Sequence, residues 1–161
     1  MRRFGSKLRE VELGRLKIEV VDQPGLYYTP HHEWVEIVGG CPCMEEMIRI
    51  GMGDYVYKTY GKPQSFRCKE GIVGSHAHQG EKLGELELER GKVAVLAPIE
   101  GYVVAINRRF QEQPDSVVGS PYHNGWIAYI RPVGALRESL DGLLRPEKYL
   151  GWLETIREEG A

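Results

Sequence analysis

The sequence predicts a mostly β domain in which two small antiparallel sheets form a flattened barrel or sandwich, closed by C-terminal helices. Twenty glycines and nine prolines divide the 161 residues into short segments, as in strands joined by turns. The segments GELELE (84–89) and VAVLAP (93–98) alternate around a very short link, which predicts a β-hairpin with its tip between Glu89 and Lys92. From residue 136 onward the apolar residues change to helical spacing.

The remaining elements follow from local patterns along the chain. Residues 1–26 are predicted to form an N-terminal extension with one strand at 16–21, and residues 27–161 the main domain with its helices. Further strands are predicted at 34–38, 47–50, 101–107 and 126–131, a short helix between 53 and 61, strand and loop over 70–80, and a long loop over 108–125. Two helices are predicted near 136–144 and 146–158, the second starting at Pro146. The predicted core comprises Trp34, Ile50, Leu86, Val95, Val103, Ile106, Trp126 and Ile130.

Composition excludes several classes of function. Hydrophobic residues make up 42% and charged residues 27%, which is typical of a globular protein. The 21 basic and 23 acidic residues give a net charge of −2, without the basic excess of nucleic-acid binders. The longest apolar run, 93–98, suits a strand and is too short to span a membrane. The N-terminus lacks the apolar run of a secretory signal and there are only three cysteines, so we expect a cytoplasmic protein.

Four segments in order resemble the motifs of the glycine cleavage system H protein family. YYTPHHEWVEI (27–37) looks like its Y-T-x-x-H-E-W-V, and GMGDY (51–55) like its G-I-T-D-Y. APIEGYVVAIN (97–107) and QPDSVVGSPYHNGWIAYI (113–130) are similar to A-P-x-S-G-x-V-V-x-V-N and N-P-x-L-V-N-x-x-P-Y-x-x-G-W. The C-terminal helices fit its closing L-x-x-L-L and Y-x-x-[FW]-L runs. The resemblance covers roughly 27–156, broken mainly by an insertion at 41–47, and four ordered motifs are far more specific than one.

The resemblance implies the biotinyl/lipoyl-carrier fold, with a hairpin that presents one lysine. A lipoate ligase attaches lipoate to that lysine in the family. The lipoyl arm carries an aminomethyl group from glycine decarboxylase to aminomethyltransferase, and dihydrolipoamide dehydrogenase reoxidises it. A long tether raises the effective concentration of the group at each partner. The chain itself is then not an enzyme, which agrees with the absence of a recognisable catalytic motif.

One departure from the family pattern falls on the attachment site. The hairpin tip of the family reads E-S-V-K-A, with the lysine modified. Counting forward from Gly80 and counting back from Ala97-Pro98 both place Arg90 at the lysine position, so no gap is needed. Arginine cannot substitute for lysine here, because its guanidinium stays protonated and offers no nucleophilic amine.

Lys92 is an alternative attachment site in a shifted frame. Glu89 stands three positions before Lys92, as Glu87 stands before Arg90, so the pattern E-x-x-K is recreated. A two-residue shift of register keeps each side chain on its face of the sheet, and Gly91 makes the turn permissive. The competing interpretation is an ordinary solvated strand lysine. We predict that the wild-type chain is lipoylated poorly or not at all, and that Arg90→Lys restores modification.

The cysteines and two histidines are the other candidate ligands. Cys41 and Cys43 lie in the insertion and Cys68 is distant, which does not match the paired C-x-x-C spacing of common metal sites. His76 and His78 would point to the same face of a strand, but no carboxylate or cysteine stands at a matching spacing. The sequence therefore predicts three reduced thiols and no bound metal.

Three hypotheses remain open from the sequence. The chain is a lipoyl carrier of the glycine cleavage type, an unmodified scaffold or regulatory relative of that carrier, or a thiol- or metal-binding protein on the same fold. The last would use the three cysteines with His76 and His78.

Overall fold

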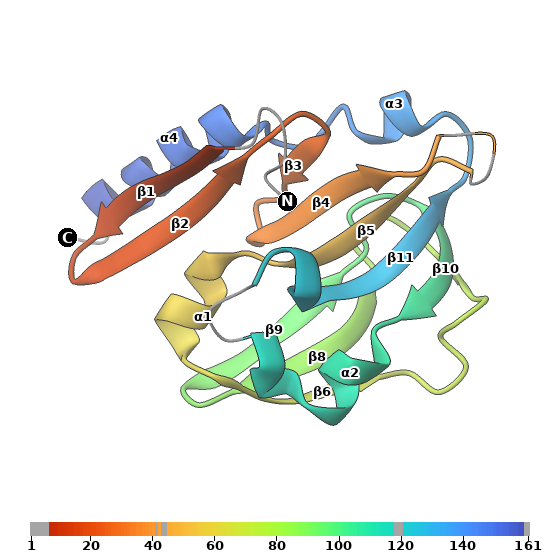
Figure 1. The fold of residues 1–161 in the computed structure, drawn as a ribbon, viewed down its shortest axis with the longest axis horizontal. Helices are drawn as coiled ribbons and strands as arrows, with labels where there is room; N and C mark the ends of the chain where they lie inside the picture. The colour runs from red at the N-terminus through yellow and green to blue at the C-terminus, as the bar shows by residue number, and fades with distance from the viewer. Residues whose placement is uncertain (1–6, 41, 43–44, 118–120, 160–161) are drawn as a thin grey trace.

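The computed structural model describes residues 7–40, 42, 45–117 and 121–159 (Figure 1). Over these residues the chain forms eleven strands in three antiparallel sheets, together with four α-helices. The large sheet has the order β3-β4-β5-β11-β10-β7, the second has the order β6-β8-β9, and β1 and β2 pair alone. The strands are β1 Lys7–Leu13, β2 Leu16–Asp22, β3 Leu26–Tyr28, β4 Glu33–Val38, β5 Met47–Met52, β6 Pro63–Cys68, β7 His76–Ala77, β8 Lys82–Leu88, β9 Gly91–Leu96, β10 Gly101–Ile106 and β11 Trp126–Pro132.

The two larger sheets face each other across one apolar core. Ile50 and Val103 of the large sheet share this core with Leu86 and Val95 of the three-stranded sheet, and all four are fully buried. Figure 1 shows the small sheet, β6-β8-β9, lying beneath the large one. The predicted fold class is confirmed, as a sandwich whose sheets do not close into a barrel. Of the other predicted core residues, Trp34 and Ile130 are buried, whereas Ile106 and Trp126 are half-buried.

The N-terminal extension forms a two-stranded ribbon and not the single predicted strand. β2 matches the predicted strand, but β1 was not predicted, because the apolar residues of KLREVEL do not keep a strict period of two. The ribbon lies along the C-terminal helix α4, Pro146–Glu159 (Figure 1). Val11, Ile18 and Val20 of the ribbon join a second core with Tyr28, Trp34, Tyr122, Tyr149 and Leu153. The extension is therefore packed into the domain.

Two helical predictions needed correction. The predicted loop over 108–125 contains α2, Arg108–Glu112, which begins because the Asn107 side chain accepts hydrogen bonds from two backbone N–H groups of the first turn. Two 3-10 turns follow at Pro114–Val117 and His123–Gly125. The predicted helix over 136–144 is only α3, Leu136–Ser139, because Leu144 forms a backbone bridge with Tyr28 of β3.

Other predictions hold in their essentials. The short helix is α1, Asp54–Tyr60, and α4 begins at Pro146 as predicted. The predicted strand within 70–80 is only the two residues of β7. Among the described residues, no helix has the length and apolar character needed to cross a membrane.

Candidate functional site

The β8–β9 hairpin has the predicted tip. Leu88 pairs with Gly91 and Glu87 pairs with Lys92, which leaves Glu89 and Arg90 as the two residues of the turn. Arg90 therefore stands at the apex, where the counting of motifs places the attachment residue of the family. Lys92 stands within β9 in the unshifted register.

The Arg90 side chain does not project from the apex but turns back to the C-terminal end of α1. Its backbone N–H donates to the Tyr60 carbonyl at 2.8 Å, and its Nε donates to the Thr59 carbonyl at 3.2 Å. One terminal guanidinium nitrogen also donates to the Lys58 carbonyl at 3.4 Å. The last four carbonyls of a helix lack partners within it and carry partial negative charge. Arg90 supplies donors to three of these four, and its charge complements the helix end.

Glu89, the other residue of the turn, is hydrogen-bonded to the backbone of Lys62. Its carboxylate accepts a hydrogen bond from the Lys62 N–H at 2.7 Å, and its own N–H donates to the Lys62 carbonyl at 3.1 Å. Gly61, between the helix and Lys62, donates to the Tyr57 carbonyl and has a positive φ of 89°, which suits glycine. The hairpin tip and the end of α1 thus hold each other through backbone groups of residues 57–62.

Lys92 lies on the solvent face of the three-stranded sheet β6-β8-β9. Its side chain is 64% exposed, and its Nζ is 3.9 Å from a carboxylate oxygen of Glu85. Glu85 also accepts a hydrogen bond from Lys82 at 2.9 Å, which holds the pKa of that carboxyl below its usual range. Lys92 is accessible to solvent, but it lies beside the strand and not at the apex.

Glu33 and Trp34, from the H-E-W part of the family motif, belong to the scaffold that supports the hairpin. Glu33 is buried, and its carboxylate accepts hydrogen bonds from the Leu96 N–H of β9 at 2.6 Å and from the Thr29 hydroxyl at 3.1 Å. Burial raises the pKa of Glu33 to about 7. Trp34 is core, as predicted, and its indole N–H donates to the Pro121 carbonyl at 3.0 Å. Glu33 therefore joins β4 to the base of the hairpin.

His32 is held among aromatic rings. It stacks on Tyr55 with the ring centres 3.8 Å apart, and on Trp152 at 5.0 Å. Its Nδ1 lies 2.8 Å from the Tyr149 hydroxyl, and burial lowers the pKa of the imidazole to about 4. This histidine is therefore neutral at physiological pH and acts in packing.

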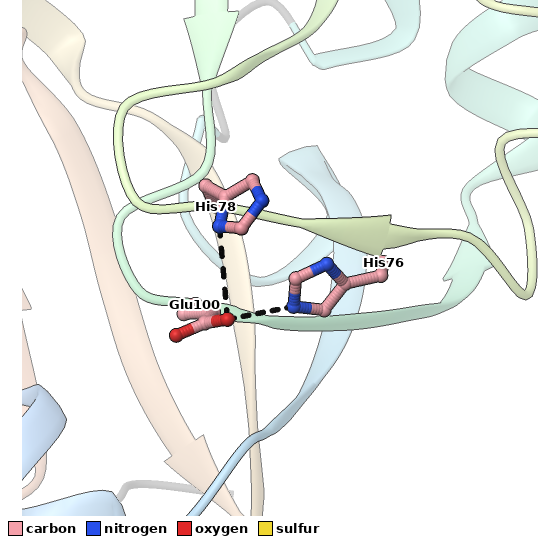
Figure 2. Close-up of side chains that lie close together, drawn as sticks. All are labelled: His76, His78 and Glu100. Atoms are coloured by element: carbon pink, nitrogen blue, oxygen red, sulfur yellow. Dashed lines mark hydrogen bonds and ion pairs between the residues drawn. The ribbon is translucent and has the colours of Figure 1, made fainter.

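His76 and His78 meet a carboxylate that the sequence analysis did not find. Figure 2 shows both imidazoles directed at Glu100. His76 Nε2 lies 2.7 Å and His78 Nδ1 lies 3.7 Å from the same oxygen, Oε2. Over the part of the chain that the structure describes, these three form the only group of three His, Cys, Asp or Glu side chains with ligand atoms all within 4.8 Å of one another.

The cysteines are not brought to this group within the described residues. Cys68 is half-buried, and its Sγ accepts a hydrogen bond from the Gln111 amide at 3.2 Å. Cys41 and Cys43 lie outside the described residues. The prediction of reduced thiols therefore stays a prediction.

Comparisons with known proteins agree with the motifs. The family model of the glycine cleavage H-protein matches residues 26–156. A probable glycine cleavage system H protein of Pyrococcus horikoshii is 32% identical over 146 residues, covering 91% of this chain and 99% of that protein. The glycine cleavage system H protein of Mycolicibacterium smegmatis is 34% identical over 125 residues, covering 77% and 90%.

A solved structure gives the same result. The crystal structure of a glycine cleavage system H protein from Mycobacterium marinum superposes with a TM-score of 0.66 at 28% identity, covering 81% of this chain and 98% of that one. The predicted resemblance is confirmed in sequence and in fold. The chain therefore belongs to the glycine cleavage H-protein family, whose members are carriers and not enzymes.

Proposed function

We propose that this chain is a member of the H-protein family that docks to the enzymes of a glycine cleavage system without carrying lipoate. It would act there as an unmodified scaffold or regulator. One observation carries the proposal: Arg90 occupies the hairpin apex and is bonded to the carbonyl groups at the end of α1.

Two physical arguments support this proposal. A guanidinium stays protonated and is not an acceptor for acylation, so Arg90 cannot carry lipoate. A ligase also needs an amine that projects into its active site, whereas the Arg90 side chain lies against α1. Moving Arg90 away from α1 to present the apex residue to a ligase would remove its hydrogen bonds, made at the protein surface, to the carbonyls of Lys58, Thr59 and Tyr60.

A lipoyl carrier that uses Lys92 is the second candidate, favoured by the 64% exposure of that side chain. Bringing Lys92 to the apex requires the two strands to slide. The slide breaks the pairing of Glu87 with Lys92 and of Leu88 with Gly91, as well as the bonds of Arg90. We therefore rank the unmodified form first.

The partners and location belong to the same proposal. The fold shared with the family supports docking to glycine decarboxylase, aminomethyltransferase or dihydrolipoamide dehydrogenase. We place the protein in the cytoplasm. Lipoate and a lipoate ligase would take no part unless Lys92 is modified.

A reconstituted glycine cleavage reaction tests the proposal. The enzymes and the lipoylated H protein are taken from Mycolicibacterium smegmatis, and this chain is added after treatment with lipoate ligase. We expect that it does not replace the H protein and that, in excess, it raises the apparent KM for the lipoylated H protein with the maximal rate unchanged. The unlipoylated M. smegmatis H protein serves as a positive control for competition.

Two outcomes would overturn the proposal. Turnover with this chain as the only carrier would establish the carrier hypothesis, and Lys92→Arg would then abolish that turnover. No competition at any concentration would exclude docking to these enzymes. Arg90→Lys is the matched variant. Turnover with its lipoylated form would show that a lipoyl arm at the apex is enough to make this chain a carrier.

A further inference from the structure

We propose that His76, His78 and Glu100 form a binding site for one divalent transition-metal ion of the zinc type. The inference is independent of the proposed function. It rests on the placement of three metal-binding side chains by the backbone of one sheet edge (Figure 2).

The register of β7 on β10 brings the three residues together. Tyr102 pairs with His76 and Gly101 pairs with Ala77, so Glu100 falls beside His78 at the next step of the ladder. Ala77 is fully buried, and the side chains on either side of it along the strand therefore point to the opposite, solvent face. Both imidazoles and the carboxylate consequently meet on one side of the edge.

The position of Glu100 is constrained by its neighbour. Gly101 lies so close to the backbone of Arg131 and to Ile130 that an added Cβ would collide with the Arg131 carbonyl and come within 2.7 Å of the Ile130 side chain. Glycine at this position lets β10 approach β11. The carboxylate is thus presented by the residue immediately before β10.

The three ligand atoms lie close enough to surround one ion once the metal replaces the 2.7 Å hydrogen bond between His76 Nε2 and Glu100. In a tetrahedral zinc site with bonds of about 2.1 Å, ligand atoms are separated by about 3.4 Å. The Glu100 oxygen lies 2.7 Å from one imidazole nitrogen and 3.7 Å from the other, and all ligand atoms lie within 4.8 Å. The two rings are nearly perpendicular, at 86°, with centres 4.6 Å apart. Small side-chain rotations would bring the three donors around one ion.

The donor set selects the class of ion. Two imidazoles and one carboxylate favour zinc, nickel or copper, whereas magnesium and calcium prefer oxygen ligands. The side chains of His78 and Glu100 are 71% and 46% exposed. The remaining coordination positions therefore face solvent and would hold water or a ligand from another molecule. The sequence alone predicts no metal, because the spacing of His76 and His78 does not reveal Glu100 as a third ligand.

Zinc titration followed by calorimetry is the test. The parent protein is studied as it is and with Cys41, Cys43 and Cys68 changed to serine, since thiolates bind zinc strongly. We expect one zinc ion per chain in the serine variant, with an apparent Kd raised at least about tenfold by His76→Ala, His78→Ala or Glu100→Gln. Excess magnesium should not displace the zinc.

Matched controls separate the site from adventitious binding. His31→Ala removes another imidazole, and Glu81→Gln removes a carboxylate near His78 in sequence; both should leave the zinc affinity unchanged. Histidine ring NMR signals should shift on zinc addition for His76 and His78 but not for His31. The proposal is overturned if zinc binds only when the cysteines are present, if the site variants bind like the parent, or if no zinc binds.

Discussion

The hairpin tip and the β7–β10 edge differ in how their polar groups are used. At the tip, Arg90 and Glu89 are engaged by backbone groups of residues 57–62. At the edge, His76 and His78 converge on a single carboxylate oxygen of Glu100 and remain open to solvent. The residue that counting places at the attachment position of the family is thus bonded to α1, whereas the two histidines and Glu100 meet at a different edge of the molecule. Fold and site chemistry are separate properties, and the second has to be measured at Arg90 and Lys92.

The largest predicted effect is the pH dependence of stability that Glu33 contributes. Glu33 joins β9 to the large sheet at the base of the hairpin. Because burial raises the pKa of Glu33 to about 7, the folded chain holds a proton that the unfolded chain releases near pH 4.5. Its stabilising contribution is therefore complete below pH 4.5 and is lost as the pH rises through 7. The slope attributable to Glu33 is at most about 1.4 kcal/mol per pH unit.

Urea unfolding of wild type and Glu33→Gln between pH 4 and pH 8 measures this contribution. We expect the variant to gain stability relative to wild type as the pH rises. His32 has the opposite sign, because its pKa is lowered to about 4 and its contribution is lost as the pH falls, but it is common to both proteins and cancels. Glu10→Gln, on the exposed part of β1, should follow the wild-type profile. Parallel curves for wild type and Glu33→Gln would contradict the assignment.

A smaller loss of stability is expected when the Arg90 side chain is removed from the tip. Arg90→Ala removes the solvent-exposed guanidinium bonds to the Lys58 and Thr59 carbonyls and should lower the free energy of unfolding by roughly 0.5–1 kcal/mol. Amide hydrogen exchange at the end of α1 should also become faster in this variant. Lys92→Ala removes an exposed charge from the same hairpin and should cost less than about 0.5 kcal/mol. Equal decreases in the free energy of unfolding of Arg90→Ala and Lys92→Ala would mean that the guanidinium bonds of Arg90 do not stabilise the end of α1.

Much of the fold was predictable because the decisive signals are local. Strands β8, β9 and β11 show clear alternation or stand next to family motifs, and Pro146 marks the start of α4. β1 escaped prediction because its apolar spacing is irregular, and the strand predicted within 70–80 had no precise bounds because the two residues of β7 carry no period. The length of α3 depends on the bridge between Leu144 and Tyr28, which are distant in the chain.

The site was predictable in its positions but not in its contacts. Counting between motifs located Arg90 at the tip, since insertions are absent on either side of it. Its bonds to the end of α1 join residues about thirty positions apart, and nothing in the sequence indicates them. Glu100 was missed for the same reason, because its approach to His78 depends on the register of β7 on β10.

The intact mass of the protein after incubation with lipoate ligase, ATP and lipoate shows whether this chain can carry a lipoyl arm. We expect wild type to keep the mass of its sequence, because its apex residue is an arginine bonded to α1, and Arg90→Lys to gain one lipoyl group. Complete modification of wild type at Lys92, abolished by Lys92→Arg, would contradict the account and establish an ordinary carrier with a displaced attachment site.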